Sequence, residues 1–191
     1  MQRKVRNVAI LAAGLMGFGI GTEYARFGYN VSFYNTNAKS SRQAMERAKE
    51  ALDTMVKNRF IKRVEADATL KRIRPTIDIA DAVRGADMAV ESALEDLAFK
   101  QALFIKLDSL LPPPVIIATN TSSLRVTDIT AKMKHPERTL TTHYIQPPHF
   151  MPLIEVVPGE KSDPAIVGQV ANMLRQMHKM VIFPHKDSPQ C

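Results

Sequence analysis

A histidine and a glutamate on either side of a proline-containing loop form the pair best suited to proton transfer. His143 lies in the apolar segment 139–144, and Glu155 lies in the apolar segment 153–157. An unpaired carboxylate in a protein core is costly, so Glu155 needs a partner, and His143 is the nearest candidate. If the two segments pair as strands through loop 146–149, the carboxylate orients the imidazole as a general base. The competing interpretation is an ordinary core histidine.

A second candidate for chemistry is the small-residue turn 12–17, which follows an apolar segment and precedes a helical one. A dinucleotide fingerprint G-x-G-x-x-G belongs at this place, but its first glycine is Ala12. Gly14 would let the backbone approach a pyrophosphate, and Gly17 would allow close packing of the helix, whose N-terminal amides favour an anion. A turn with small residues for packing alone is the alternative. The candidate cofactor contacts are Ala12, Ala13, Gly14, Leu15, Met16 and Gly17.

At the end of the second predicted strand stands Asn35, where the fingerprint has an acidic residue for the ribose hydroxyls. Asparagine can donate hydrogen bonds to a ribose but does not repel a phosphate. Because Lys39 and Arg42 follow, the residues allow NADP as well as NAD. The alternative is that Asn35 caps a loop and that both cations are solvated.

Two further strand ends carry polar groups that would meet at one edge of a parallel sheet. Glu95 follows the strand 88–92, with Lys100 about one helical turn later, and Ser122 follows the strand 115–119. Ligands bind at the carboxyl edge of such sheets. A serine that merely caps the next helix is the competing interpretation for Ser122.

Strands alternate with helices along the whole chain, which predicts an α/β fold with a doubly wound, mostly parallel sheet. The expected strands are 5–11, 30–35, 74–78, 88–92, 115–119, 139–144, 153–157 and 180–183. The expected helices are 15–27, a helical pair within 38–72, then 79–84, 96–110, 126–133 and 164–177.

Composition narrows the class of protein. The chain has 191 residues, a formal net charge of +7, and one cysteine, Cys191, so no internal disulfide can form. The basic start followed by segment 8–21 is too glycine-rich and too short for a signal peptide or a membrane span. The single cysteine favours a reducing, cytoplasm-like compartment. Aromatic residues make up 6% and tryptophan is absent, which argues against nucleic-acid binding. Without a Cys pair or HxxxH spacing, no metal site is predicted.

Taken together, five motifs make the chain resemble the 3-hydroxyacyl-CoA dehydrogenase family over essentially its whole length. They are segments 8–17, 90–95, 120–124, 143–155 and 186–189. The resemblance implies a Rossmann-type NAD-binding domain that oxidises the 3-hydroxyl of an acyl-CoA, as in fatty-acid β-oxidation. Another candidate family is the β-hydroxyacid dehydrogenases of the 6-phosphogluconate type. Such an enzyme has no use for the His143 and Glu155 pair, so this family ranks below the 3-hydroxyacyl-CoA dehydrogenases.

The resemblance also implies roles for individual residues. His143 would be the general base and Glu155 the group that orients it, while Ser122 would lie between substrate and nicotinamide. Glu95, Lys100 and Gln146 would line the nicotinamide side of the cofactor site. The protruding helical pair would face the phosphates of coenzyme A with Lys57, Arg59, Lys62 and Arg63. The alternative for each of these residues is a solvated helix face.

Departures from the family pattern bear on activity. Ala12 replaces a glycine, which would strain a turn of positive φ by about 1 kcal/mol. Asn35 replaces an acid, and Gln146 replaces an asparagine. We expect an NAD-binding domain at 1–186 and a linker stub at 187–191, with the family's all-helical domain absent and the active site half open. Such a chain would need a helical-domain partner or a homodimer. The alternative is a non-catalytic or truncated dinucleotide-binding relative.

Overall fold

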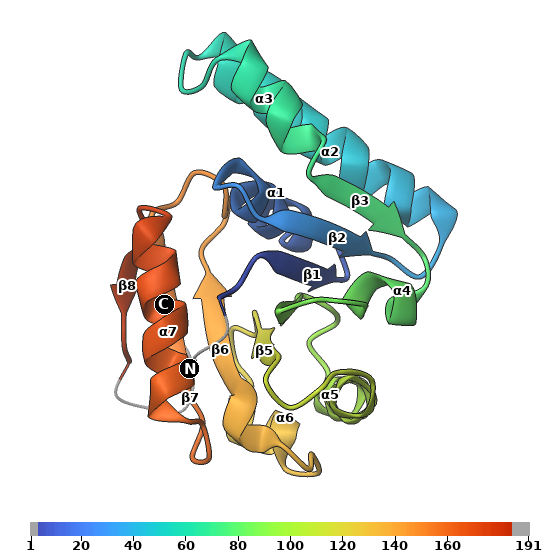
Figure 1. The fold of residues 1–191 in the computed structure, drawn as a ribbon, viewed down its shortest axis with the longest axis vertical. Helices are drawn as coiled ribbons and strands as arrows, with labels where there is room; N and C mark the ends of the chain where they lie inside the picture. The colour runs from blue at the N-terminus through green and yellow to red at the C-terminus, as the bar shows by residue number, and fades with distance from the viewer. Residues whose placement is uncertain (1–3, 185–191) are drawn as a thin grey trace.

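The computed structural model describes residues 4–184. Its strands are β1 Asn7–Leu11, β2 Asn30–Tyr34, β3 Ile73–Thr76, β4 Met88–Glu91, β5 Ile116–Thr119, β6 Thr139–Tyr144, β7 Leu153–Pro158 and β8 Met180–Ile182. They form one eight-stranded sheet in the order β3-β2-β1-β4-β5-β6-β7-β8 (Figure 1). Strands β1 to β6 run parallel, β7 is antiparallel to β6, and β8 is parallel to β7. The predicted doubly wound, mostly parallel Rossmann-type sheet is confirmed.

The helices are α1 Gly17–Arg26, α2 Ala38–Lys57, α3 Arg63–Leu70, α4 Ile79–Val83, α5 Leu97–Leu110, α6 Val126–Thr130 and α7 Pro164–Gln176. Side chains cap several of them: Asn37 accepts a hydrogen bond from the amide of Ser40 at 2.9 Å, and Asp96 accepts one from that of Phe99 at 2.7 Å. Two predicted helices are too long. The first begins at residue 17, because 12–16 form the turn, and α6 ends at Thr130, where the chain turns back.

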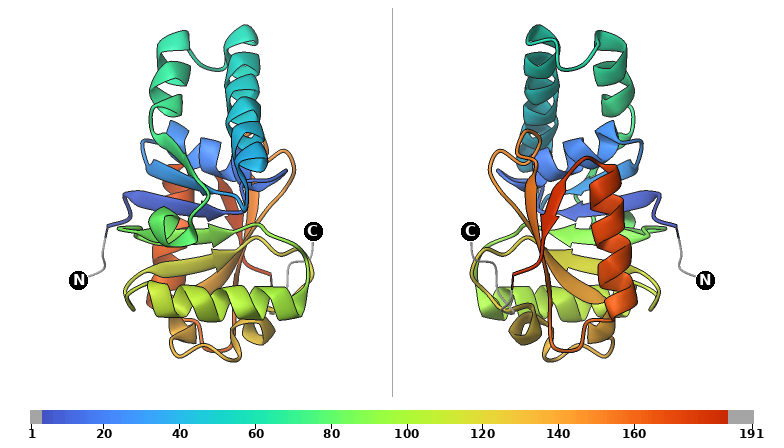
Figure 2. Two further views of the ribbon diagram at one scale, coloured as in Figure 1. Left: turned by 90° about the vertical axis from the view of Figure 1, so that its right-hand side faces the viewer. Right: turned by 90° about the vertical axis from the view of Figure 1, so that its left-hand side faces the viewer.

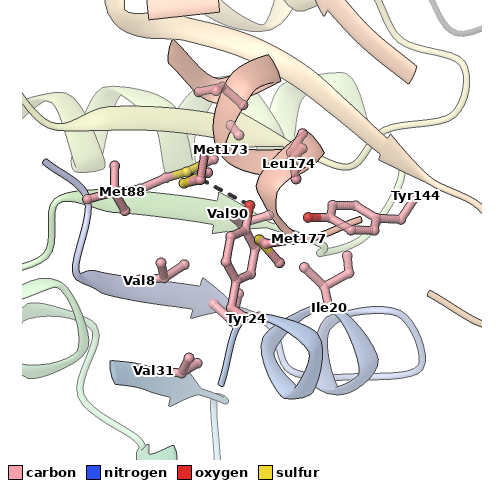
Figure 3. Packing of buried hydrophobic residues seen from close by; sticks show 14 of the residues in the cluster. Val8, Ile20, Tyr24, Val31, Met88, Val90, Tyr144, Met173, Leu174 and Met177 are labelled. Atoms are coloured by element: carbon pink, nitrogen blue, oxygen red, sulfur yellow. Dashed lines mark hydrogen bonds between the residues drawn. The ribbon is translucent and has the colours of Figure 1, made fainter. Parts of the chain in front are cut away.

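Alternate residues of each strand point into two separate cores, as burial on both faces of a parallel sheet requires. Val8 and Ile10 of β1 pack with α1, α2 and α7, whereas Ala9 and Leu11 pack with α4, α5 and α6. Figure 3 shows the first core, in which Tyr24 of α1 lies among methionines and aliphatic side chains of the sheet and α7.

The helical pair α2 and α3 projects beyond the body of the domain (Figure 2). Its two helices hold each other through a small core of Leu52, Met55 and Ala66. Most of its surface is therefore exposed, in agreement with the expected protruding pair.

The carboxyl ends of β1, β4, β5 and β6 converge at one edge of the sheet. The strand order reverses between β1 and β4, and the loops that leave these two strands open a crevice there. Every strand end with chemical groups singled out in the sequence lies at this edge.

Among the described residues, no helix is long and apolar enough to cross a membrane. The motif 186–189 and the boundary at 186 lie outside the described residues.

Candidate active site

His143 and Glu155 face each other across the antiparallel pair β6 and β7. The imidazole Nδ1 lies 2.8 Å from Oε2 of Glu155. Glu155 is 1% exposed and His143 is 8% exposed, so the contact is shielded from water. A carboxylate at this place holds the Nδ1 proton and leaves Nε2 as the ring nitrogen for a substrate. The expected contact between the two side chains is present.

His143 lines a cavity of about 570 Å³ at the carboxyl edge of the sheet. We call it the central cavity. Its wall consists of Leu15, Met16, Ser92, Ala93, Glu95, Lys100, Asn120, Ser122, His143, Tyr144, Ile145, Gln146 and Leu153. Five of the sequence-predicted polar residues (Glu95, Lys100, Ser122, His143 and Gln146) are thus brought together around one space.

A buried glutamate that sequence reasoning did not assign to the site holds one wall of this cavity. Glu91, at the end of β4, is 0% exposed. Its carboxylate accepts hydrogen bonds from Nζ of Lys100 at 2.6 Å and from the hydroxyl of Thr119 at 2.6 Å. Lys100 is therefore buried and tied to Glu91, with Glu95 at 3.3 Å. Glu91, like Glu155, is an acid in an apolar strand and therefore needs a partner.

Glu95 fastens the loop that follows β5. Its Oε1 accepts hydrogen bonds from the hydroxyl of Thr121, from the amides of Ser122 and Ser123 at 3.2 Å each, and from the hydroxyl of Ser123 at 3.0 Å. Burial alone would raise the pKa of Glu95, but the hydrogen bonds from the hydroxyls of Thr121 and Ser123 and the charge of Lys100 lower it below its ordinary value. The loop presents Ser122 as an exposed residue at the cavity, and the next helix has no side-chain cap, so the capping interpretation of Ser122 is wrong.

Ala12 occupies the left-handed region of backbone space, with φ of 67°. The turn therefore adopts the conformation that the fingerprint's first glycine serves, at the strain expected for alanine. The amides of Ala12 and Ala13 both donate to the carbonyl oxygen of Tyr34, at 3.0 and 3.2 Å. Ala13 is 1% exposed and packs in the core, so its predicted cofactor contact would have to come from the backbone.

The two glycines of the turn differ in their surroundings. A Cβ on Gly17 would collide with the carbonyl oxygen of Ala12 and lie 3.2 Å from Ile10, so Gly17 permits the close approach of α1 to β1. A Cβ on Gly14 would have no neighbour within 4 Å. The space beside Gly14 at the start of α1 is thus open to an anion. The amide of Phe18 donates to the carbonyl oxygen of Gly14 at 3.2 Å, so an anion would be bound by the amides beside it.

Asn35 lines a second cavity of about 360 Å³, between the ends of β1 and β2 and helix α5. We call it the side cavity. The Nδ2 atom of Asn35 is buried and has no hydrogen-bond partner among the described residues. Ala12 lines the side cavity, and Leu15 and Met16 line the central cavity, which places the turn 12–17 between them. Open space beside Gly14, flanked by two cavities and an unused amide donor, suits a dinucleotide. Lys39 and Arg42 are exposed and line neither cavity.

The basic residues of the helical pair lie away from both cavities. Lys57, Arg59 and Lys62 are exposed at its tip. Arg63 is paired with Asp53 at 2.6 Å, so its charge is partly used within the pair itself. Within residues 4–184, no cluster of three or more His, Cys, Asp or Glu side chains could hold a metal ion.

Comparison with known proteins shows which proteins this chain resembles. Residues 7–188 match the NAD-binding domain of 3-hydroxyacyl-CoA dehydrogenase. The chain is 33% identical over 188 residues to 5-formyl-3-hydroxy-2-methylpyridine 4-carboxylate 5-dehydrogenase of Mesorhizobium japonicum, covering 97% of this chain and 59% of that protein. It is 34% identical to 3-hydroxyadipyl-CoA dehydrogenase of Escherichia coli K12, over 97% of this chain and 39% of that protein.

The fold agrees with these relatives. The crystal structure of 3-hydroxybutyryl-CoA dehydrogenase from Escherichia coli K12 superposes with a TM-score of 0.91 at 33% identity, over 95% of this chain and 38% of that one. The chain thus spans less than two thirds of the length of these relatives. Since the match extends across almost all of its residues, the chain belongs to the 3-hydroxyacyl-CoA dehydrogenase family, through that family's NAD-binding domain.

Proposed function

We propose that this chain transfers hydride between the C3 position of a 3-hydroxyacyl-CoA and NAD, with His143 as general base. The observation that carries the proposal is the 2.8 Å contact between Nδ1 of His143 and Oε2 of Glu155 on the wall of the central cavity. A non-catalytic binding protein has little use for a buried acid beside an imidazole, because that acid is costly to bury.

The proposed step oxidises the 3-hydroxyl of the substrate to a carbonyl. The hydroxyl proton of the substrate passes to Nε2 of His143, the C3–O bond becomes a carbonyl, and the C3 hydrogen leaves with its electron pair. Bound NAD supplies the acceptor for that hydride. Glu155 stabilises the imidazolium that results, since its carboxylate accepts the Nδ1 proton's hydrogen bond throughout. Ser122 is exposed at the same cavity and can hydrogen-bond the reacting oxygen.

For the cofactor, we propose that it lies across the turn 12–17 from the side cavity to the central one. The open space beside Gly14 and the amides at the start of α1 would take the pyrophosphate. The unpartnered Nδ2 of Asn35 would donate to a ribose hydroxyl. Glu95, Lys100 and Gln146 line the central cavity, where the nicotinamide would lie.

The substrate class is the finer part of the proposal. Lys57 and Arg59 are exposed on the protruding pair and would meet the phosphates of coenzyme A. The Mesorhizobium relative, however, is named for a pyridine carboxylate. A small aromatic alcohol or aldehyde is therefore the second candidate substrate, and it would not need the basic tip.

A non-catalytic dinucleotide-binding protein is the alternative function, because Ala12, Asn35 and Gln146 depart from the family pattern. Against it, Ala12 already has the backbone conformation of the fingerprint's first glycine. A helical partner chain or a homodimer, and a cytoplasmic location, stay predictions.

The test is calorimetric titration of the chain with NADH, with NADPH as comparison, followed by turnover assays. One arm supplies NADH and acetoacetyl-CoA and follows oxidation of NADH. The other supplies NAD and the pyridine aldehyde and follows reduction of NAD, because the Mesorhizobium relative is named a dehydrogenase of a formyl compound. Each arm is run with and without an added helical domain from a family member. We expect micromolar binding of NADH, and oxidation of NADH by acetoacetyl-CoA when the helical domain is present. Binding without turnover in either arm, with the helical domain present, would favour the non-catalytic alternative, and absence of binding to folded protein would contradict the proposed cofactor site.

A further inference from the structure

A buried ion pair outside the candidate active site consists of Lys179, just before β8, and Glu23 of α1. Nζ of Lys179 lies 2.9 Å from Oε1 of Glu23, and the two residues are 6% and 4% exposed. Charges are seldom buried so deeply unless they are paired and hydrogen-bonded. The proposed hydride transfer uses neither residue, so the pair needs another explanation.

The other two N–H groups of Lys179 donate to a single segment of the chain. It donates to the carbonyl oxygen of Pro148 at 2.9 Å and to that of Met151 at 3.0 Å. An ammonium group has three donors, and all three are therefore satisfied here. An apolar side chain of the same length would fill the space but could not bind two carbonyl oxygens.

The segment that receives these bonds is 145–152, the connection between β6 and β7. Its first part carries Gln146 at the central cavity, and its two ends lead directly into the strands of His143 and Glu155. The position of this connection therefore affects the relation between the histidine, the glutamate and Gln146.

The same segment packs closely against helix α1. A Cβ on Gly19 would lie 2.7 Å from Cγ of Pro148 and 2.8 Å from Nδ1 of His149. Gly19 thus lets the segment lie directly against the helix. One turn later, Glu23 pairs with Lys179, which in turn donates to the backbone of the same segment. This contact also explains why position 19 is a glycine.

We propose that Lys179, held by Glu23, is a positioning residue that fixes segment 145–152 so that Gln146 and His143 face the central cavity in reactive geometry. The inference rests on the proposed function for its catalytic consequence. The anchoring itself can be tested without activity.

The variant Lys179→Met removes the donors and keeps the length of the side chain. It should fold, because Glu23 retains its ion pair with Arg26 at 2.6 Å. Exposed Lys132→Met, at the other end of the domain, is the matched control. A second variant, Glu23→Gln, keeps the lysine and its two carbonyl bonds, and should show a smaller effect.

The primary measurement is amide hydrogen exchange of segment 145–152, whose Phe150 and Met151 amides donate to the carbonyl of Pro147. We expect exchange there to rise by about tenfold or more in Lys179→Met and not in the control. The NMR signal of the His143 Nδ1 proton should broaden as its contact with Glu155 loosens. Unchanged exchange and an unchanged signal in folded Lys179→Met would overturn the proposal.

Kinetics then separate positioning from binding. We expect kcat to fall by about tenfold to a hundredfold in Lys179→Met while the KM for NADH changes little. A mobile segment with unchanged kcat would overturn the catalytic consequence. Wild-type protein that binds NADH but reduces no substrate would instead contradict the proposed function, and hydrogen exchange and the His143 signal would still decide the anchoring.

Discussion

The dinucleotide turn and the histidine end of the candidate site are built from different parts of the chain. At the turn 12–17, the groups that matter are backbone amides, a positive φ and the absence of Cβ atoms. At His143, they are side chains that contact one another at 2.8 Å. A backbone site can keep its conformation when the residue type changes, as the φ of 67° at Ala12 shows. A side-chain site does not, because each functional atom belongs to one residue.

Replacing the histidine should therefore have the largest effect. We expect His143→Gln to lower kcat by about a hundredfold to ten-thousandfold, because it removes the general base. NADH affinity should stay within about twofold, since the turn is untouched. Steady-state NADH oxidation with acetoacetyl-CoA measures the first quantity, and fluorescence titration measures the second. Activity within tenfold of wild type would show that another group takes the proton.

Alanine substitutions of the two glycines of the turn should differ in their effects on NADH affinity and on the free energy of unfolding. Gly14→Ala adds a methyl group to open space, so we expect about tenfold weaker NADH binding and a nearly unchanged free energy of unfolding. Gly17→Ala pushes α1 against Ala12, so it should also lose about 1–3 kcal/mol of stability. Urea unfolding and NADH titration distinguish the two. Equal loss of stability in both variants would contradict the open space beside Gly14, and unchanged NADH affinity in Gly14→Ala would contradict its placement beside the cofactor.

Restoring glycine at position 12 should stabilise the chain. The φ of 67° is strained for alanine, so we expect Ala12→Gly to raise the free energy of unfolding by about 1 kcal/mol. Ala13→Gly is the control, and it should lower that free energy, since it removes a buried methyl group. Urea unfolding checks both variants. A destabilised Ala12→Gly protein would mean that the turn gains more from the methyl group than it loses to strain.

The smallest expected effect concerns pH and Glu95. Because the pKa of Glu95 is lowered in the folded chain, its charged form contributes stability above the unfolded value of about 4.3. That contribution is lost as the pH falls through the lower folded pKa. We expect Glu95→Gln to cost less than about 1 kcal/mol at pH 7, and the difference from wild type to shrink below pH 4.

Urea unfolding between pH 3.5 and 7 measures this difference, with the exposed Glu46→Gln as control. A difference that grows toward acid would mean that Glu95 is not stabilised in its charged form.

Local signals in the sequence were sufficient for most of the fold. Strand 139–144 begins and ends where it was predicted, and the helical pair lies within 38–72. The sequence could not reveal the order of β7 and β8 at the sheet edge, because that order depends on contacts between distant segments. The helix ends at 15 and 133 were wrong for a similar reason, since apolar spacing continues through turns that tertiary contacts create.

In the candidate site, the pairing of His143 with Glu155 could be predicted because an isolated acid in an apolar strand demands a partner. Glu91 carried the same signal, but its partners Lys100 and Thr119 come from two other elements. Lys179 had no such signal, because it lies in a turn, and its partners are a helix residue and two backbone carbonyls. A bond from a side chain to the backbone leaves no mark on the residue type of its acceptor.

The most direct test of the proposed pair is a double-mutant cycle on hydride transfer in a single turnover. The chain is loaded with NADH, mixed with acetoacetyl-CoA, and compared with His143→Gln, Glu155→Gln and the double variant. If Glu155 acts through His143, the double variant should be no slower than His143→Gln alone. Multiplied losses in the double variant would contradict the pair as one catalytic unit.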